Sequence, residues 1–342
     1  MFKDELKNCE DVVTIPSQGA AILSCDPGRD MWNTVMGTFT NNISVVPAGQ
    51  LYLYRYNDET LPALVQIRLS DYADAARFHP LGIEYHEASS TLLVSNHHFD
   101  GPRIEIFKLD ISSHPPIAHH SRTMESPLIR TPNAIVALNE HEFYFTNDHR
   151  FQIQTRRYFA MLETYAALPL GEIMHVKMHH NSSATIRAVT HLAYPNGLAL
   201  LNSSTLAVAL TGSCKVQLFS IRPDRSLVFA AEVKTPFMPD NLSCDQNGVL
   251  LISGHPHPPT LERLVKHRRR CLEAGLLTPQ PCDGSRAPSA VIEWTWERGL
   301  ENLYLSAAEY GSSSAAVRDS ELQVGIVTGL YEEGILVWKS SK

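Results

Sequence analysis

A short pattern of apolar alternation, turn and apolar run recurs along the chain. In its clearest copy, the polar pair Asp240-Asn241 precedes a brief alternation, a turn signal at Asp245–Gly248 and the apolar run Val249–Ile252. This order predicts two antiparallel strands joined by a tight turn, since strand side chains alternate between faces and Asx and glycine residues favour turns. The polar pair therefore lies where the first strand begins.

Related phrases begin near residues 10, 82, 133, 196 and, more loosely, 314. With the copy at 241, the starts are 72, 51, 63, 45 and 73 residues apart. Irregular strand–turn–strand repeats of this length predict an all-β fold, a six-bladed β-propeller that forms a single domain over residues 1–342. In a propeller, the equivalent ends of the inner strands face one central channel.

The residues at these strand starts are oxygen donors, two carboxylates and three amides without thiolate or imidazole. They are Glu10, Asn133, Asn196, Asp240 and Asn241. A set of this kind suits calcium, which takes six to eight oxygen ligands, better than zinc. The alternative is that the amides hydrogen-bond strand ends and water in the channel. The repeats alone leave both interpretations open.

Two segments depart from the strand pattern. Residues 155–168 have apolar side chains at helical spacing and are followed by Pro169, which predicts a helix that packs on the propeller or covers the channel mouth as a lid. Residues 257–290 form an insertion that begins with a helix over 258–275. The basic run Lys266–Arg270 in that helix is either a solvated face or a contact for an anionic substrate or partner.

The remaining segments give weaker signals. Residues 26–50 predict loops around a broken strand, and residues 51–70 predict two outer strands. Residues 335–338 predict a last strand that closes the ring against the first blade.

Composition limits the classes of function. A chain of 342 residues with 44% hydrophobic residues can bury a sizeable core. A net charge of −7 gives no electrostatic case for nucleic acid. No apolar run approaches the roughly 20 residues of a membrane span, and no basic-then-apolar leader begins at Met1. Six cysteines without a CxxC pair predict mostly reduced thiols, and hence a soluble, cytoplasmic protein.

Several motifs occur together along the chain. They are Leu81-Gly82-Ile83, Ser95-Asn96-His97, Arg103–Leu109, Asn147-Asp148-His149, Pro195-Asn196-Gly197, and Asp240-Asn241-Leu242 with His255-Pro256. In these motifs, from Glu10 to about Gly334, the chain resembles the serum paraoxonase/arylesterase family, and its fungal-type members in particular. The resemblance implies a six-bladed propeller that holds calcium in its channel.

The resemblance also implies metal ligands. The ligands of the family's catalytic calcium fall on Glu10, Asn133, Asn196, Asp240 and Asn241. The family's second, structural calcium would use Asp11 and the carbonyl of Ile83. Its third ligand is an aspartate where this chain has Ala134, so we expect the second site to be weak or empty.

The histidine dyad of the family maps onto Leu81 and His97, so its first member is missing. We expect His97, or the pair Asp148 and His149, to act as the catalytic base. Hydrogen bonding at a strand end is the alternative role for each of them. The substrate pocket is expected to be lined by Leu81, Tyr158, Phe159, Leu162 and His255, of which His255 is a further candidate base.

Three functions follow. The leading one is a calcium-dependent hydrolase of lactones or aryl esters, acting on a small, hydrophobic molecule. The second is a non-hydrolytic enzyme of natural-product biosynthesis, a cyclase or isomerase of secondary metabolism, because Leu81 removes a base and leaves a Lewis acid to orient a substrate. The third is a binding propeller with structural calcium. A serine esterase has no support, since no Gly-x-Ser-x-Gly motif occurs.

Overall fold

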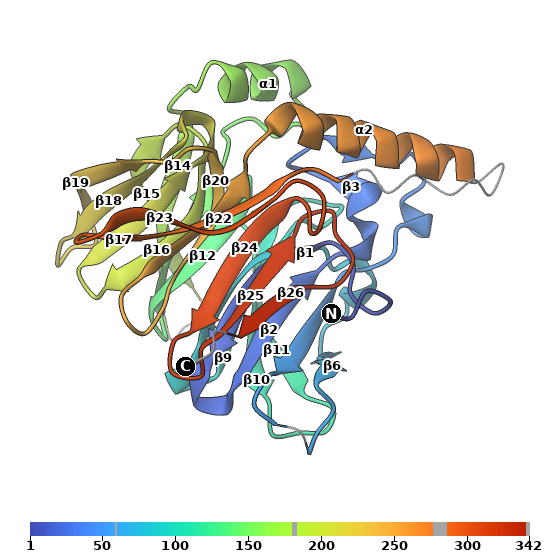
Figure 1. The fold of residues 1–342 in the computed structure, drawn as a ribbon. Coiled ribbons are helices and arrows are strands. Elements are labelled where there is room, and N and C mark those ends of the chain that lie inside the picture. The colour runs from blue at the N-terminus through green and yellow to red at the C-terminus, as the bar shows by residue number, and fades with distance from the viewer. Residues whose placement is uncertain (59, 180–182, 276–285, 340–342) are drawn as a thin grey trace.

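The computed structural model describes residues 1–58, 60–179, 183–275 and 286–339. Six sheets surround a central channel, and the two helices lie together at one end of the ring (Figure 1). This arrangement confirms the predicted six-bladed β-propeller. The helices α1 (Arg157–Tyr165) and α2 (Pro258–Gly275) confirm the two predicted helical segments.

Each blade begins with its inner strand and continues outward. Blade 1 contains β1 (Cys9–Ile15), β2 (Ala20–Cys25), β5 (Gln50–Arg55) and β6 (Leu64–Gln66). Blade 2 contains β8 (Pro80–His86), β9 (Thr91–Asn96), β10 (Arg103–Asp110), β11 (Ile117–Met124) and β7 (Arg68–Ser70). Blade 3 contains β12 (Pro132–Asn139), β13 (Glu142–Asn147), β14 (Gly171–Met178) and β15 (Ala184–Leu192).

The second half of the ring is built in the same way. Blade 4 contains β16 (Pro195–Asn202), β17 (Thr205–Leu210), β18 (Lys215–Ile221) and β19 (Leu227–Lys234). Blade 5 contains β20 (Met238–Cys244), β21 (Leu250–His255), β22 (Ser289–Thr295) and β23 (Gly299–Ser306). Blade 6 contains β24 (Ser313–Asp319), β25 (Val324–Gly329) and β26 (Leu336–Lys339).

Two blades depart from the expected four antiparallel strands. In blade 2, β7 adds a fifth strand that runs parallel to β11, and blade 6 has three strands. We expected two outer strands over residues 51–70, but this segment contributes to three, β5, β6 and β7. The additional strand arises because the chain leaves blade 1 after β6 and enters blade 2 at β7. The expected broken strand of residues 26–50 is a short hairpin of β3 (Trp32–Asn33) and β4 (Thr38–Phe39).

The last strand and the N-terminal segment both contribute to the closure of the ring. β26 pairs with β25 inside blade 6, and its Val337 packs against a core cluster that contains Val12 and Tyr54 of blade 1. Residues 1–8 also lie against residues 332–335. The amide of Asn8 donates to the carbonyl of Glu332 at 2.8 Å, and that of Gly334 donates to Leu6 at 2.8 Å. These bonds join the two ends of the propeller. In addition, β24 of blade 6 packs on β1 of blade 1.

The state of the cysteines differs from expectation. Cys9 and Cys25, which face each other on β1 and β2, form a disulfide, whereas Cys214 and Cys244 are free thiols. The expectation of reduced thiols is therefore wrong for this pair, and it no longer supports the cytoplasmic assignment. Neither helix of the described chain has the length and apolarity needed to cross a bilayer.

The apolar core lies between blades. One cluster joins Ile22 and Leu53 of blade 1 to Ile83, Val94 and Phe107 of blade 2, and similar clusters fill the later spaces. Period-two alternation produces this arrangement, because each sheet presents one apolar face to the blade before it and one to the blade after it. Burial of both faces explains why many strands here read as continuous apolar runs.

Near the channel, hydroxyl groups bond adjacent blades together. Ser24 donates to the carbonyl of Leu81 at 2.7 Å. Thr146 donates to Asn196 at 2.9 Å, and Ser253 to Ser314 at 2.7 Å. In each case a hydroxyl on the second strand of one blade satisfies a carbonyl on the inner strand of the next. Blades can therefore approach closely without leaving buried carbonyls unbonded.

Close approach also requires glycine on the inner strands. A Cβ on Gly197 would lie 2.5 Å from the carbonyl oxygen of Asp240 and 2.6 Å from the Cα of Asn241. We expect Gly197→Ala to destabilise the fold by roughly 1–3 kcal/mol, since the backbone of the next blade would have to move. The urea midpoint, followed by circular dichroism, measures this change.

Gly212→Ala is the matched control. A Cβ there would meet nothing closer than 3.5 Å, so we expect a shift within about 0.5 kcal/mol. Equal midpoints for the two variants would contradict the close-packing account of the inner strands.

Candidate functional site

The inner strands are interrupted at the channel end, and four of them carry proline as their first or second residue. Regular pairing is broken between Pro80 and Ile83, and likewise after Pro132, Pro195 and Pro239. Proline cannot donate to the strand ladder, and a bulge turns the following side chain out of the sheet. The residues that follow these prolines, such as Asn133, Asn196 and Asp240, are therefore directed away from regular sheet positions.

The structure brings the predicted ligands together in a network of amide–carboxylate bonds. The Nδ2 of Asn241 donates to Oε1 of Glu10 at 2.8 Å, which joins blade 5 to blade 1. The Nδ2 of Asn196 donates to Oδ1 of Asp240 at 2.6 Å, and that of Asn133 donates to Oδ2 of Asp148 at 3.2 Å. All of these side chains are buried. Each amide thus uses its nitrogen within the protein and keeps its oxygen available.

Three oxygens of this network have no partner among the described residues. They are Oε2 of Glu10, Oδ1 of Asn133 and Oδ1 of Asn196, and all three are buried. Burial raises the pKa of Glu10 well above its usual range, and the charges of Asp11 and Asp240 raise it further. Buried oxygens without donors are rare in folded proteins and are costly to leave unpaired.

The donor set fits a hard cation. The unpaired oxygens and the carboxylate of Asp240 are the neutral and anionic oxygen ligands that calcium takes. Within the described chain no cluster of three or more His, Cys, Asp or Glu side chains has the arrangement of a metal site. That finding is compatible with calcium here, because three of the five candidate ligands are asparagines.

The residues proposed for a second ion are bonded to each other. The carboxylate of Asp11 accepts the amide of Val12 at 2.8 Å through Oδ1 and the amide of Ile83 at 2.8 Å through Oδ2. Burial raises the pKa of Asp11 to about 7. Ala134, which is buried beside Asn133, supplies no oxygen from its side chain. The expectation that this second site is weak or empty stays a prediction.

His97 has both ring nitrogens engaged. Its Nε2 lies 2.6 Å from the carbonyl oxygen of Pro132, and since a carbonyl only accepts, Nε2 carries the proton. Its Nδ1 faces the hydroxyl of Thr34. Burial lowers the pKa of His97, which favours the neutral ring. Leu81, which occupies the place of the family's other histidine, is also buried.

Asp148 and His149 form an ion pair at the rim. The Nδ1 of His149 lies 3.0 Å from Oδ1 of Asp148, and its Nε2 lies 2.7 Å from the hydroxyl of Thr164 on α1. Burial opposes the charged ring, but the carboxylate outweighs it, and the pKa of His149 is raised. This pair therefore connects Asn133, which is hydrogen-bonded to Asp148, to helix α1.

His255 differs from these two histidines. Its Nε2 lies 3.0 Å from Oδ2 of Asp240, which can only accept, so this nitrogen carries the proton. Its Nδ1 is buried and has no hydrogen-bond partner in the described residues. Of His97, His149 and His255, it alone keeps an unpaired ring nitrogen beside the predicted ligands.

The aromatic face of α1 is exposed to solvent. Tyr158 is 86% exposed, and Phe159 and Leu162 also lie on the solvent side of the helix. The inward residues are Ala160 and Glu163, and Glu163 accepts hydrogen bonds from the amides of residues 150 and 151. The expected apolar stripe is thus wrong: polar bonds to the rim hold this helix, and they override its apolar periodicity.

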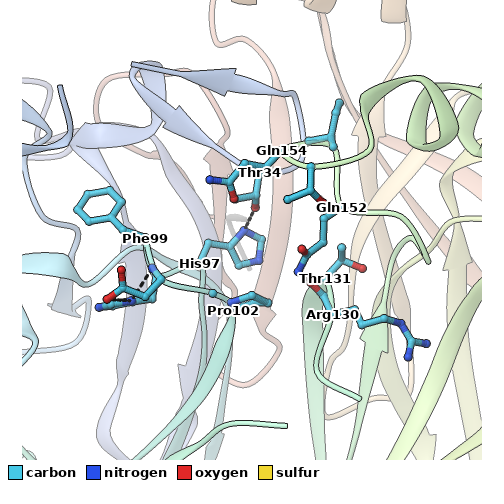
Figure 2. Close-up of a pocket in the computed structure, with 13 residues that line it drawn as sticks. Thr34, His97, Phe99, Pro102, Arg130, Thr131, Gln152 and Gln154 are labelled. Carbon is cyan, nitrogen blue, oxygen red and sulfur yellow. Dashed lines mark hydrogen bonds and ion pairs between the residues drawn. The ribbon is translucent and has the colours of Figure 1, made fainter. Parts of the chain in front are cut away.

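A cavity of about 270 Å³ opens beside His97 (Figure 2). Its wall carries hydroxyls, amides, an arginine and Phe99; the lining residues are Thr34, His97 to Pro102, Arg130, Thr131 and Gln152 to Thr155. Thr34 and His97 lie side by side on this wall in Figure 2. The cavity therefore shares His97 with the channel.

Sequence analysis missed three residues near the site. Thr34 is held by the turn that Asn33 caps through its Oδ1. Tyr194 stacks on His149 with ring centroids 4.3 Å apart. Arg29 is buried and donates a hydrogen bond to the carbonyl of Pro80, the first residue of β8. The proline that follows Tyr194 and begins β16 was the one available signal, because proline also begins two other inner strands, β8 and β12.

Comparison with known proteins gives the family of the chain. The sequence profile of the arylesterase family matches residues 10–267. The chain belongs to the arylesterase family. Serum paraoxonase/arylesterase 2 of Canis lupus familiaris is 25% identical over 256 residues, 70% of this chain and 70% of that protein. Serum paraoxonase/lactonase 3 of Oryctolagus cuniculus is 25% identical over 215 residues, 61% of this chain and 58% of that protein.

A solved structure shares the fold of this arylesterase family member. A gluconolactonase from Xanthomonas campestris superposes with a TM-score of 0.55 at 15% identity, over 97% of this chain and 85% of that one. At this identity the likeness shows the propeller fold alone. Family membership supports a hydrolase of the esterase or lactonase type.

Replacement of one amide tests the cation site. We expect Asn196→Ala to lower the bound calcium measured by elemental analysis after dialysis, because it removes an unpaired oxygen. Added calcium should then raise the melting temperature less than in the wild type. At 100 times the dissociation constant, binding to the folded state alone stabilises a protein by about 2.7 kcal/mol.

Asn202→Ala is the matched control, since Asn202 lies exposed at the other end of β16. It should bind calcium as the wild type does. An unchanged calcium content in Asn196→Ala would remove this residue from the ligand set.

Proposed function

We propose that this protein is a calcium-dependent hydrolase of lactones or aryl esters, acting on small, hydrophobic molecules. The observation that carries the proposal is the set of buried, unpaired oxygens on Glu10, Asn133 and Asn196 at the channel end. Family membership supports the same reaction class.

Five side chains would hold the ion: Glu10, Asn133, Asn196, Asp240 and Asn241. When bound there, calcium supplies a Lewis acid for the ester carbonyl. The amide–carboxylate bonds keep the side chains in place before an ion or substrate arrives. Such preorganisation matters because hydrolysis gains most from polar groups that need not move in the transition state.

We assign the general base to His255. Asp240 accepts the proton-bearing Nε2, which fixes the tautomer whose lone pair is on Nδ1. This nitrogen can take a proton from a water molecule that attacks the ester, and can return it to the departing oxygen. The role needs a ring nitrogen without a protein partner, and neither His97 nor His149 has one.

His97 then acts as a positioning residue. Its bond to Pro132 holds blade 2 against blade 3, and its bond to Thr34 orients a hydroxyl on the cavity wall. The cavity is the place we assign to the part of the substrate next to the reacting carbonyl. His149 and Asp148 are likewise positioning residues, since they connect Asn133 to α1.

Substitution of His255 tests the base. We expect His255→Gln to lower turnover of phenyl acetate by about 10²–10⁴-fold, the usual effect of losing a general base. Calcium content should stay at the wild-type level, because glutamine can still donate to Asp240. Steady-state kinetics and elemental analysis on the same sample measure both quantities.

His257→Gln is the control, since its exposed ring lies two residues further along the chain. It should leave turnover unchanged. Wild-type turnover in His255→Gln, together with a large loss in His97→Gln, would move the role of base to His97.

Leu81 favours a second candidate function, a cyclase or isomerase of natural-product biosynthesis. A buried leucine stands where the family's dyad has a histidine, so the channel keeps its oxygen ligands but has one base fewer. A panel of lactones and phenyl esters, with and without a calcium chelator, separates the two candidates. We expect hydrolysis that the chelator abolishes and added calcium restores.

Absence of hydrolysis across the panel, with calcium still bound in the channel, would favour the non-hydrolytic candidate. Hydrolysis that persists in the chelator would contradict the assigned role of the cation.

A further inference from the structure

Arg29 is a buried cation without a carboxylate partner. It belongs to the short 3₁₀ helix of residues 27–30 and is 3% exposed. Its Nη2 donates to the carbonyl of Pro80 at 3.2 Å, and its Nε is buried without a partner. Among the residues that the structure describes, no carboxylate oxygen lies within 4.0 Å of this guanidinium. A buried charge of this kind is costly unless an anion pairs with it.

The acidic residues on either side of Arg29 are bonded elsewhere. Asp26 accepts the amide of Gly28 at 2.9 Å, and its other oxygen lies 3.1 Å from the ring of His79. Asp30 pairs with Arg268 of α2 through bonds of 2.6 and 2.8 Å. Neither carboxylate is therefore the counter-ion of Arg29.

Arg29 lies at the catalytic end of the channel. The carbonyl that it contacts belongs to Pro80, which begins β8 and precedes Leu81. Burial is the main cause of the lowered pKa of His97, and the charge of Arg29 lowers it further. The same charge acts on Glu10, in the opposite direction to the effect of burial there. The guanidinium thus lies within electrostatic reach of the predicted ligand Glu10 and of His97 on the cavity wall.

Glu10 is an internal carboxylate on which the charge of Arg29 acts. One of its oxygens accepts the amide of Asn241, and the other is a predicted ligand of the cation. If Glu10 and Asp240 hold the ion, the ion balances the negative charges of these carboxylates. The positive charge of Arg29 then has no internal anion to pair with among the described residues. Guanidinium groups match carboxylates well, because the planar fork can donate two parallel hydrogen bonds.

We propose that Arg29 binds a carboxylate group carried by the substrate, so that the preferred esters or lactones are anionic. This inference rests on the proposed hydrolase function for the reacting group, but the anion site itself does not. It predicts which substrates the protein prefers. Their carboxylate lies at a short distance from the ester, on the side of Leu81.

Binding of benzoate and benzamide tests the site without any turnover. The two compounds match in size and differ in charge. With calcium present, titration calorimetry should show benzoate binding to the wild type at least about tenfold more tightly than benzamide, as expected for charge-assisted hydrogen bonds. In Arg29→Gln, which can still donate to the carbonyl of Pro80, the preference should fall to within about twofold.

Arg318→Met is the matched control. Arg318 is a partly buried arginine near the far end of β24 in blade 6, paired with Asp245 and Glu293 of blade 5. It should keep the tenfold preference even if its stability falls. Arg29→Lys, which keeps the charge but not the fork, should retain part of the preference and covers the case in which Arg29→Gln does not fold.

Turnover supplies the second measurement. For 5-oxotetrahydrofuran-2-carboxylate and its carboxamide, Arg29→Gln should raise KM for the carboxylate about tenfold and leave that for the carboxamide unchanged. No benzoate preference in the wild type, or the same preference in Arg29→Gln, would overturn the proposal and leave Arg29 as an internal counter-charge. Arg29-dependent benzoate binding without turnover of any ester would support the anion site and refute the hydrolase.

Discussion

The burial of many polar groups at the channel end is the constraint on which the rest of the structure depends. Six inner strands converge there, and each brings backbone groups and side chains out of water. Hydroxyls on neighbouring strands satisfy the carbonyls of Leu81, Asn196 and Ser314, and amides satisfy one oxygen each of Glu10 and Asp240. The groups that remain unpaired in this otherwise satisfied region are those to which a functional role is most reasonably assigned.

Local sequence features make this convergence geometrically feasible. Proline as the first or second residue of four inner strands ends the ladder and turns the next side chain toward the channel. Glycines such as Gly82 and Gly197 allow the backbone of the next blade to come within contact distance, where any Cβ would overlap a carbonyl. The site is thus a product of the same strand ends that let the blades pack. A substitution there affects stability and chemistry together, which is why metal content and turnover have to be measured on the same sample.

The segments outside the blades complete the site from above. The hairpin of β3 and β4 places Thr34 against His97, and the indole of Trp32 donates to the carbonyl of His97 at 2.8 Å. Helix α2 holds Asp30 through Arg268, and so positions the turn that carries Arg29. The proposed chemistry therefore combines oxygen ligands and a base from the blades with His97 and Arg29, whose surroundings come partly from these segments.

The sequence by itself determined the ring and its polar interior. Strand–turn–strand repeats with apolar alternation can bury both faces only by packing blade on blade, and oxygen donors at equivalent strand ends then have to meet. The positions of the two helices also followed from local pattern. Each of these inferences depends on residues that are close in sequence or related by the repeat.

Tertiary structure alone decided the rest, because it depends on contacts between residues far apart in sequence. The part of residues 1–8 in closing the ring, the disulfide of Cys9 and Cys25, and the outward face of α1 were not expected from the sequence. The histidines could not be ranked from sequence either. Whether His97 or His255 keeps an unpaired nitrogen depends on Thr34, Pro132 and Asp240, and whether Arg29 has a counter-ion depends on Arg268 and His79, which occupy the acids beside it.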